Sequence, residues 1–233
     1  MIFHNLVRAT AGGIVAADPW TVLLIHGDGN IVDASPFARA LTQINGAASS
    51  PTAPKFGSGS MFFDGDACVQ LNGSTDFQFG TGHFTIDFWV KLGSTGANYQ
   101  DFLQFAHYSI MIRSSSGKIN LLLSFDGSSW GFNGLSSSAV FTANIWHHVA
   151  LVRNGTAIVA YVDGVPSITT TTSNAIYFDI TRKITIGGET NLDGVTPLTN
   201  YLQNGYIDEL RISKGIARWT ADFSNALPTA PYG

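Results

Sequence analysis

The sequence predicts an all-β fold, a sandwich or a barrel of short strands. Turn-forming residues recur at intervals of about ten residues, with short runs of β-branched and aromatic residues between them, a spacing typical of sandwiches and barrels. Helix signals are scarce. The one helical turn that we expect lies near residues 215–223, ahead of Pro228 and Pro231.

The expected strands are separated by turns or by loops rich in glycine and serine. In chain order they are residues 20–26, 60–64, 67–71, 83–92, 101–106, 108–113, 118–125, 145–153, 156–163, 165–170, 183–187 and 205–213. Residues 1–19 precede this series. We expect them to form an N-terminal arm, with Asp18-Pro19 at the boundary and a sandwich domain over residues 20–233.

The clearest pattern is that of residues 83–92, where large apolar residues alternate with mostly polar ones. Because successive side chains on a strand point to opposite faces, this period of two predicts one buried face and one solvent face. Trp89 is the exception on the predicted solvent face.

Two tight hairpins are expected in the second half of the chain. Asn154-Gly155 and Asp163-Gly164 are dipeptides that favour the positive φ angles of two-residue hairpin turns. The three strands that they join would form an antiparallel meander. Its first strand, residues 145–153, is largely apolar on both faces, as expected of a central strand.

The composition predicts a large core and a weakly charged surface. Of 233 residues, 45% are hydrophobic and 12% are charged, where an average domain has about 25% charged residues. A surface rich in Ser, Thr, Asn, Gln and Gly suits contact with sugars or with other subunits. The net charge is −4 and no basic run occurs, so we expect no nucleic-acid partner and no membrane partner.

Cysteine usage and the N-terminus bear on the compartment. Cys68 is the only cysteine, so no disulfide within the chain is possible, and we expect a buried thiol in the strand at residues 67–71.

Residues 1–19 lack the pattern of a secretory signal peptide, because Arg8 interrupts the apolar stretch. Synthesis in the cytoplasm is therefore expected.

An ordered set of motifs runs from about residue 20 to the end of the chain. The segments are residues 22–29, 56–65, 79–90, 146–153, 161–164, 184–188 and 205–220. Together they resemble the concanavalin A-like, laminin G-like jelly rolls, in particular the form found in bacteriophage structural proteins and bacterial surface proteins. The resemblance implies two packed antiparallel sheets, a fold that carries lectins, glucanases and pure scaffolds alike.

The acid pair of a retaining glucanase cannot be recognised in the sequence. Such an enzyme needs two carboxylates about 5–5.5 Å apart. The chain has two glutamates, Glu189 and Glu209, and no alternating acidic triplet. Asp208 and Glu209 are adjacent and are expected to face opposite ways on a strand, while Asp64 and Asp66 lie in a turn. We therefore expect no enzymatic activity.

The resemblance also implies a metal site. Related jelly rolls often hold one structural calcium ion between a carboxylate near the first strand and another on the last strand. The matching positions are Asp28 and Asp208, which would bind calcium together with backbone carbonyl oxygens. The alternative is that Asp28 caps a turn and that Asp208 pairs with Arg211 or faces solvent.

Sugar recognition needs an aromatic face beside planar hydrogen-bonding groups. The candidate carbohydrate-binding residues are the loop-borne side chains Trp130, Tyr99, Asn98, Asp126, Asn133 and His107, with Gln100 as a further candidate. Trp130 leads the set because an exposed tryptophan in the turn-rich stretch 126–131 indicates a partner. The alternative is a loop anchor that is tucked into the sandwich.

The resemblance implies a virion structural protein with a lectin-like domain. One expected function is that of a phage tail-fibre or baseplate adhesin that binds host-surface polysaccharide. The other is that of a capsid decoration or assembly protein that binds other virion proteins, with a glycoside hydrolase as the remote alternative. The arm would dock on a neighbouring subunit or fold over its own sandwich. A homotrimer is implied by resemblance alone, and the expected location is the virion or otherwise a bacterial surface.

Overall fold

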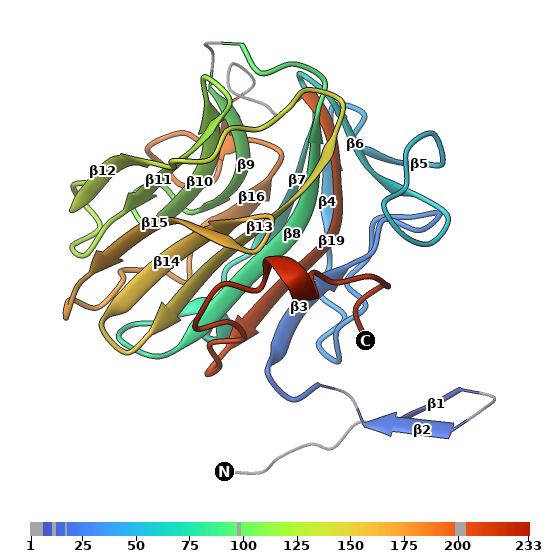
Figure 1. Ribbon diagram of the computed structural model, residues 1–233, viewed down its shortest axis with the longest axis horizontal. Coiled ribbons are helices and arrows are strands. Elements are labelled where there is room, and N and C mark those ends of the chain that lie inside the picture. The colour runs from blue at the N-terminus through green and yellow to red at the C-terminus, as the bar shows by residue number, and fades with distance from the viewer. Residues whose placement is uncertain (1–6, 11–12, 17, 97–98, 199–203) are drawn as a thin grey trace.

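The computed structural model describes residues 7–10, 13–16, 18–96, 99–198 and 204–233. Two large antiparallel sheets pack face to face (Figure 1), which confirms the predicted all-β sandwich. No helix in these described ranges is long and apolar enough to cross a membrane.

The eight-stranded sheet has the order β15-β14-β13-β8-β19-β6-β5, and β3 also pairs with β19. Its strands are β3 (Thr21–Ile25), β5 (Ala48–Ser50), β6 (Ser60–Asp64), β8 (Phe84–Leu92), β13 (Trp146–Asn154), β14 (Ala157–Val162), β15 (Val165–Thr171) and β19 (Asn204–Lys214). The long β19 pairs along one side with β8 and along the other with β6 and then β3. The first and last strands of the sandwich are therefore neighbours.

The seven-stranded sheet has the order β12-β11-β10-β9-β16-β7-β4. Its strands are β4 (Thr42–Ile44), β7 (Cys68–Asn72), β9 (Gln100–Phe105), β10 (Ile110–Ser115), β11 (Lys118–Leu123), β12 (Phe132–Ser136) and β16 (Lys183–Ile186). Two small hairpins, β1 (Val7–Thr10) with β2 (Gly13–Ala16) and β17 (Glu189–Thr190) with β18 (Pro197–Leu198), and the 3₁₀ turns η1 (Thr75–Phe77) and η2 (Ser224–Ala226) complete the described elements.

Each predicted strand is present, with ends within two residues of the prediction. The sequence did not predict β1, β2, β4, β5, β12, β17 and β18, which are five residues or shorter. Of these, β4, β5 and β12 lie at the edges of the two large sheets, and the other four form the two small hairpins. The helical turn expected near residues 215–223 is wrong. Those residues form bends, and the turn is η2 at Ser224–Ala226.

The core lies between the sheets and is rich in phenylalanine. Phe88 of β8 contacts Phe102 of β9 across the sandwich, with ring centroids 5.7 Å apart, and both side chains are fully buried. Cys68 is 1% exposed, and burial raises the pKa of its thiol to about 11. The predicted buried thiol is confirmed.

Both predicted hairpins are present. In the second, Asp163 and Gly164 form the two-residue turn with φ of 50° and 79°, as predicted. In the first, Asn154 pairs with Ala157, so the turn residues are Gly155 and Thr156 rather than Asn154 and Gly155.

The outer face of β8 differs from the prediction. Asp87 is fully buried there and Trp89 is 4% exposed, although the alternation predicts a solvent face. The C-terminal segment covers this face: Phe223 packs on Tyr161 of β14, and the Tyr232 hydroxyl contacts His148 Nε2 of β13 at 3.0 Å. The tryptophan that interrupts the polar pattern is therefore the sign of a second, outer layer of packing.

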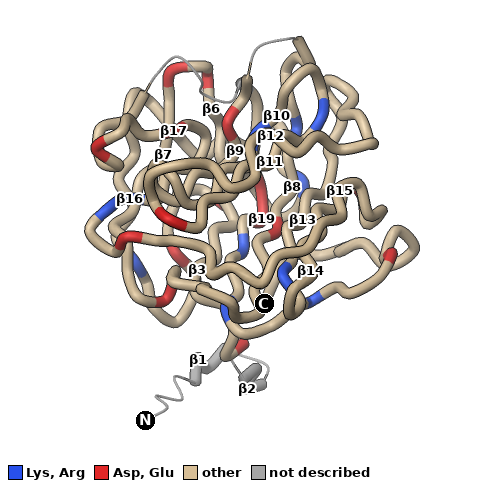
Figure 2. The backbone as a smooth tube through the Cα atoms, turned by 90° about the vertical axis from the view of Figure 1, so that its left-hand side faces the viewer, with Lys and Arg blue, Asp and Glu red and all other residues tan. Residues whose placement is uncertain are grey.

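Charged residues are sparse and mixed in sign. Figure 2 shows Lys and Arg positions scattered among Asp and Glu positions over the described chain. Several arginines form ion pairs: Arg39 with Asp76, Arg211 with Asp87 and Arg218 with Asp18.

Candidate functional site

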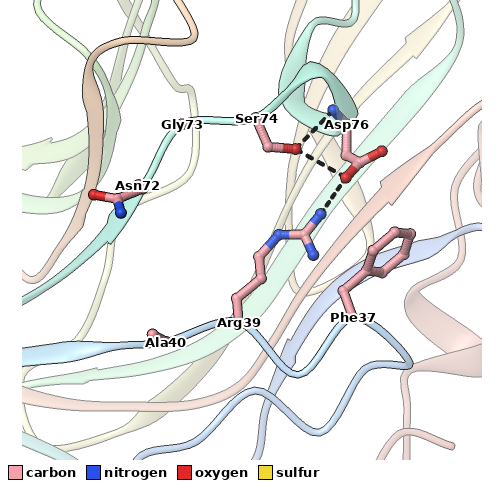
Figure 3. Close-up of a pocket in the computed structure, with 7 residues that line it drawn as sticks. All are labelled: Phe37, Arg39, Ala40, Asn72, Gly73, Ser74 and Asp76. Carbon is pink, nitrogen blue, oxygen red and sulfur yellow. Dashed lines mark hydrogen bonds and ion pairs between the residues drawn. The ribbon is translucent and has the colours of Figure 1, made fainter.

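A cavity of about 330 Å³ opens at one end of the seven-stranded sheet, between the loop before β4 and the end of β7 (Figure 3). It is lined by Phe37, Arg39, Ala40, Asn72, Gly73, Ser74 and Asp76. Two chain segments that are far apart in sequence therefore build it, one on each side.

Asp33 shapes the first segment. Its carboxylate, 7% exposed, accepts the N–H of Leu24 at 3.1 Å and the N–H of Arg39 at 2.8 Å. These bonds tie the loop to β3 and fix the position from which Arg39 enters the cavity. Phe37, two residues earlier, stays 48% exposed.

The second segment is capped by Ser74. The Ser74 hydroxyl accepts the Asp76 N–H at 3.0 Å and donates to Asp76 Oδ2 at 2.8 Å, a side-chain cap for η1. Asp76 Oδ2 also accepts a hydrogen bond from the Arg39 guanidinium, so an ion pair joins the two walls of the cavity.

The guanidinium of Arg39 stacks on aromatic rings, with its carbon 4.2 Å from the centre of Phe37 and 4.9 Å from that of Phe77. Burial lowers the pKa of Arg39, although the charges of Asp76 and Asp33 act in the opposite direction. Arginine stays charged at such a position. The charges of Arg39 and Asp76 therefore cancel, and the lining of the cavity has no net charge but contains several hydrogen-bond donors and acceptors.

This set of groups suits a sugar. The half-exposed ring of Phe37 lies beside the Arg39 guanidinium, which is paired with the Asp76 carboxylate. Asn72 lines the opposite side of the cavity (Figure 3). A small, partly apolar cavity with a few convergent polar groups is the usual form of a ligand site.

The sequence did not identify this site. The available signal was Phe37, an aromatic residue in a loop with serine, proline and alanine around it, which is the same signal that singled out Trp130. Its partners Asn72 and Asp76 come from a separate part of the chain, and only the packing of that loop against the end of β7 brings them together.

Of the predicted carbohydrate-binding residues, Trp130 and His107 are close together. Their ring centroids are 6.0 Å apart, and Tyr108, which the sequence analysis did not select, lies 5.1 Å from Trp130. All three side chains are partly exposed. We call them the Trp130 cluster. The loop after β11 carries Trp130, and the turn after β9 carries the other two.

Other predicted residues are placed elsewhere. Tyr99 lies just before β9, at the opposite end of that strand from His107, where Arg113 stacks 3.6 Å from its ring centre. Gln100 starts β9, and its amide donates to the Ser94 carbonyl at 2.8 Å. The predicted residues therefore do not form one site.

Asp126 and Asn133 flank the Trp130 loop. Asp126 accepts the N–H groups of Ser128 and Ser129, both at 2.8 Å, and so shapes its own turn. Asn133 is exposed in β12. Asn98 lies outside the described residues.

The two predicted calcium ligands flank one loop. Asp28 Oδ1 accepts the N–H of Gly59 at 2.9 Å, and Asp208 Oδ2 accepts the N–H of Lys55 at 2.7 Å. Backbone donors thus occupy oxygens that a calcium ion would need. Across the described ranges, no three His, Cys, Asp or Glu side chains group so as to hold a metal. The pair fits calcium poorly as arranged, and the calcium site stays a prediction.

The alternative stated for Asp208 is wrong. Asp208 is fully buried, and Arg211 pairs with Asp87 instead, with the Arg211 Nη2 atom 3.0 Å from Asp87 Oδ2. Burial raises the pKa of Asp208 to about 7, although the N–H groups of Phe56 and Lys55 act in the opposite direction.

A β-bulge overturns the expected orientation of the last pair of acids. The register of β19 shifts between Asp208 and Arg211, and Glu209 has a φ of 52°. Ile207 and Leu210, on either side of the pair, are both in the core. The extra residue breaks the alternation of faces, so Asp208 and Glu209 both lie on the outer face.

Glu209 acts as a structural anchor. Its carboxylate accepts hydrogen bonds from His26 Nδ1 at 2.9 Å and from the Tyr232 N–H at 2.7 Å. It is 1% exposed and connects β19 to the end of β3 and to the C-terminal segment.

A further pair of acids lies where β17 contacts β9. Burial raises the pKa of Asp101 well above its usual range, and the neighbouring charge of Glu189 adds to this effect. Asp101 is fully buried and its carboxylate oxygens have no hydrogen-bond partner among the described residues, while Glu189 is 7% exposed. Neither carboxyl group is open to a substrate in this conformation.

Known structures with the same fold include botulinum neurotoxin receptor-binding domains. The serotype D binding domain has 13% identity and a TM-score of 0.62, over 88% of this chain and 51% of that one. A mosaic serotype C/D domain, described with tetraethylene glycol on its Hcn sub-domain, has 12% identity and a TM-score of 0.63, over 88% and 50%. At these identities the likeness shows the fold alone.

A third structure comes from botulinum neurotoxin type C, whose cell entry depends on interaction with two ganglioside molecules. It has 12% identity and a TM-score of 0.59, over 84% of this chain and 48% of that one. The chain thus spans about half the length of these structures. No curated protein matches the chain in sequence.

The sequence itself matches a family. The family of concanavalin A-like lectins and glucanases matches residues 63–218, a narrower span than the resemblance from about residue 20. The match covers more than half of the chain and includes the strands that form most of both sheets. The chain therefore belongs to the concanavalin A-like lectin/glucanases superfamily.

Proposed function

We propose that this chain is a non-enzymatic glycan-binding module, carried on a virion as a tail-fibre or baseplate component that attaches to host-surface polysaccharide. The observation that carries the proposal is the cavity where the exposed ring of Phe37 lies beside the polar groups of Arg39, Asn72 and Asp76. The lectin-like fold supports it.

Binding without catalysis is favoured by the state of the carboxyl groups. A retaining glycosidase needs two acids that both reach the sugar. In the described chain, Asp101, Glu189, Asp208 and Glu209 are buried, and Asp76 is engaged by Arg39 and Ser74. A glycoside hydrolase is therefore the weaker alternative.

The virion location rests on the resemblance of the motifs to phage jelly rolls and on the sparsely charged surface, which suits subunit packing. Botulinum neurotoxin type C, which shares the fold, interacts with gangliosides, and this supports a glycan as the partner of the present chain. A trimeric assembly is part of the same proposal.

A capsid decoration or assembly protein is the second candidate, and one observation favours it. Among the described residues, β1 and β2 pair with each other and with no strand of the large sheets. In Figure 1 this hairpin extends away from the sandwich. Isolated two-stranded hairpins are at best marginally stable in water, so this arm suits docking on another virion protein.

A glycan array of bacterial surface polysaccharides tests the main proposal. We expect the purified chain to bind at least one glycan, and we expect Phe37→Ala to weaken that binding by about tenfold, because the variant removes the apolar face at a cost of roughly 1–1.5 kcal/mol.

The matched control is Tyr99→Ala, an aromatic residue of similar exposure, 40% against 48%, that lies away from the cavity. We expect this variant to bind as the parent chain does. A folded chain that binds no glycan on the array contradicts the proposal.

A further inference from the structure

The cavity and the Trp130 cluster lie at the same end of the seven-stranded sheet. Asn72, at the end of β7, is opposite Lys183 in β16. Next to it, Ile184 is opposite Phe105 in β9, which in turn is opposite Ile110 in β10. Phe105 closely precedes the turn with His107 and Tyr108. Three strand spacings separate β7 from β10, a span of roughly 14 Å.

Arg182 lies beside the cavity through its backbone, and its guanidinium donates to the Leu192 carbonyl at 2.6 Å. The Arg182 carbonyl accepts the N–H of Gly73, which lines the cavity, at 2.9 Å. Burial lowers the pKa of His107, and the positive charge of Arg182 lowers it further. One residue therefore borders both the cavity and the cluster.

Tyr177 extends the aromatic surface of the cluster. It is 37% exposed, and its N–H donates to the Ser124 carbonyl at 3.0 Å. Its ring lies against the backbone of Gly127, in the loop that carries Trp130. Exposed rings thus recur along this end of the sheet, with Phe37 at one side and Tyr177 at the other.

Two arginines along this line are paired with carboxylates, and Asp126 in the Trp130 loop adds a further carboxylate. Arg39 pairs with Asp76, and Arg182 lies 3.5 Å from Asp179. The lowered pKa of His107 keeps its ring neutral near pH 7. A polyanion would meet the carboxylates of Asp76, Asp179 and Asp126 here, which favours a neutral ligand.

We infer that the cavity and the Trp130 cluster are two subsites of one extended site, which binds a neutral polysaccharide along its chain rather than a single terminal sugar. This inference rests on the proposed function and specifies its ligand. One sugar ring fills the Phe37 cavity, a later sugar in the same chain stacks on Trp130, and the sugars between them pass over Arg182.

The test uses neutral oligosaccharides of graded length. Malto-, cello- and chito-oligosaccharides, from disaccharide to octasaccharide, are titrated calorimetrically into the full chain and into Phe37→Ala, Trp130→Ala and Tyr99→Ala. In the series that binds, we expect the octasaccharide to bind about tenfold tighter than the disaccharide, because it reaches both subsites. Phe37→Ala and Trp130→Ala should each remove most of that gain, and Tyr99→Ala should remove none.

The outcomes separate this inference from the function on which it rests. If a disaccharide binds as tightly as the octasaccharide, or if only one of the two aromatic residues affects the long ligand, the extended site is overturned while glycan binding stands. If neither these series nor the surface polysaccharides bind, both proposals fail. Unchanged circular-dichroism melting curves for each variant ensure that a lost affinity reports contact rather than unfolding.

Discussion

At the scale of single residues, the polar groups buried beneath the C-terminal segment make stability depend on pH. The hydrogen bond to Glu209 raises the pKa of His26 against the effect of burial, and the charges of Asp28 and Asp208 raise it further. Such a histidine stabilises the fold fully below its unfolded pKa of about 6.5 and loses that contribution as pH rises through the folded value. Ionisation of the buried Asp208, whose pKa is raised to about 7, also lowers the stability of the fold, between about pH 4 and about pH 7.

We therefore expect the melting temperature to fall as pH rises from about 4 to about 7 through Asp208, and from about 6.5 upward through His26. In His26→Gln the fall above about pH 6.5 should be smaller, because the contribution of this histidine is gone. Differential scanning calorimetry across the range measures it. His83→Gln, at an exposed histidine, is the control and should keep the parent slope. An unchanged slope in His26→Gln would show that the contact with Glu209 does not control the pH response.

The calcium prediction is also decided by single residues. If Asp28 and Asp208 hold calcium in spite of their backbone donors, millimolar calcium should raise the melting temperature over that in chelator, and Asp28→Asn should remove the increase. Equal melting temperatures in calcium and in chelator would indicate that the two carboxylates act only on the loop of residues 55–59, as their hydrogen bonds suggest.

At the scale of elements, the C-terminal segment stabilises the eight-stranded sheet from outside. Phe223 is 7% exposed. Its ring stacks on that of Trp219, with centroids 4.3 Å apart, and contacts that of Tyr161, with centroids 5.2 Å apart. Phe223→Ala should cost about 3 kcal/mol in the free energy of unfolding, measured by urea denaturation. Phe37→Ala is the matched control, because its ring is half exposed and its loss should cost little stability. A small effect of Phe223→Ala would mean that the segment is not part of the cooperative unit.

The strands of the sandwich were predictable because their apolar residues follow a period of two. The outer layer was not, because residues 215–233 contain no such repeat and reach the sheet through isolated rings. The bulge in β19 was equally hidden: nothing in Asp208-Glu209-Leu210 indicates that Glu209 adopts a positive φ, which arises from the pairing of β19 with several strands at once.

At the scale of the whole molecule, the N-terminal hairpin separates the two candidate functions. Removing residues 1–17 keeps Asp18, whose carboxylate pairs with Arg218, so the sandwich should melt as before. If the arm docks on other virion proteins, the truncated chain should still bind glycan on the array but fail to enter particles in a complementation assay. Normal incorporation of the truncated chain would exclude the docking arm.

The site was predictable only in part. Trp130 and His107 were selected separately and meet because β9 and β11 end on the same side of the sheet. Tyr99 was selected by the same criterion, yet it lies at the other end of β9, since a loop residue does not reveal to which end of a strand its partners belong. The Phe37 cavity depends on contacts between distant segments that no local pattern encodes.

The burial of Cys68 has a practical consequence for imaging and distance measurements. A thiol that is 1% exposed and has a pKa of about 11 exists almost entirely in its unreactive protonated form at neutral pH. Maleimide dyes or spin labels should therefore attach selectively to a cysteine engineered at an exposed position such as Asn154, which ends β13 in the eight-stranded sheet. The native residue can stay in place while a fluorophore follows the protein onto a cell surface.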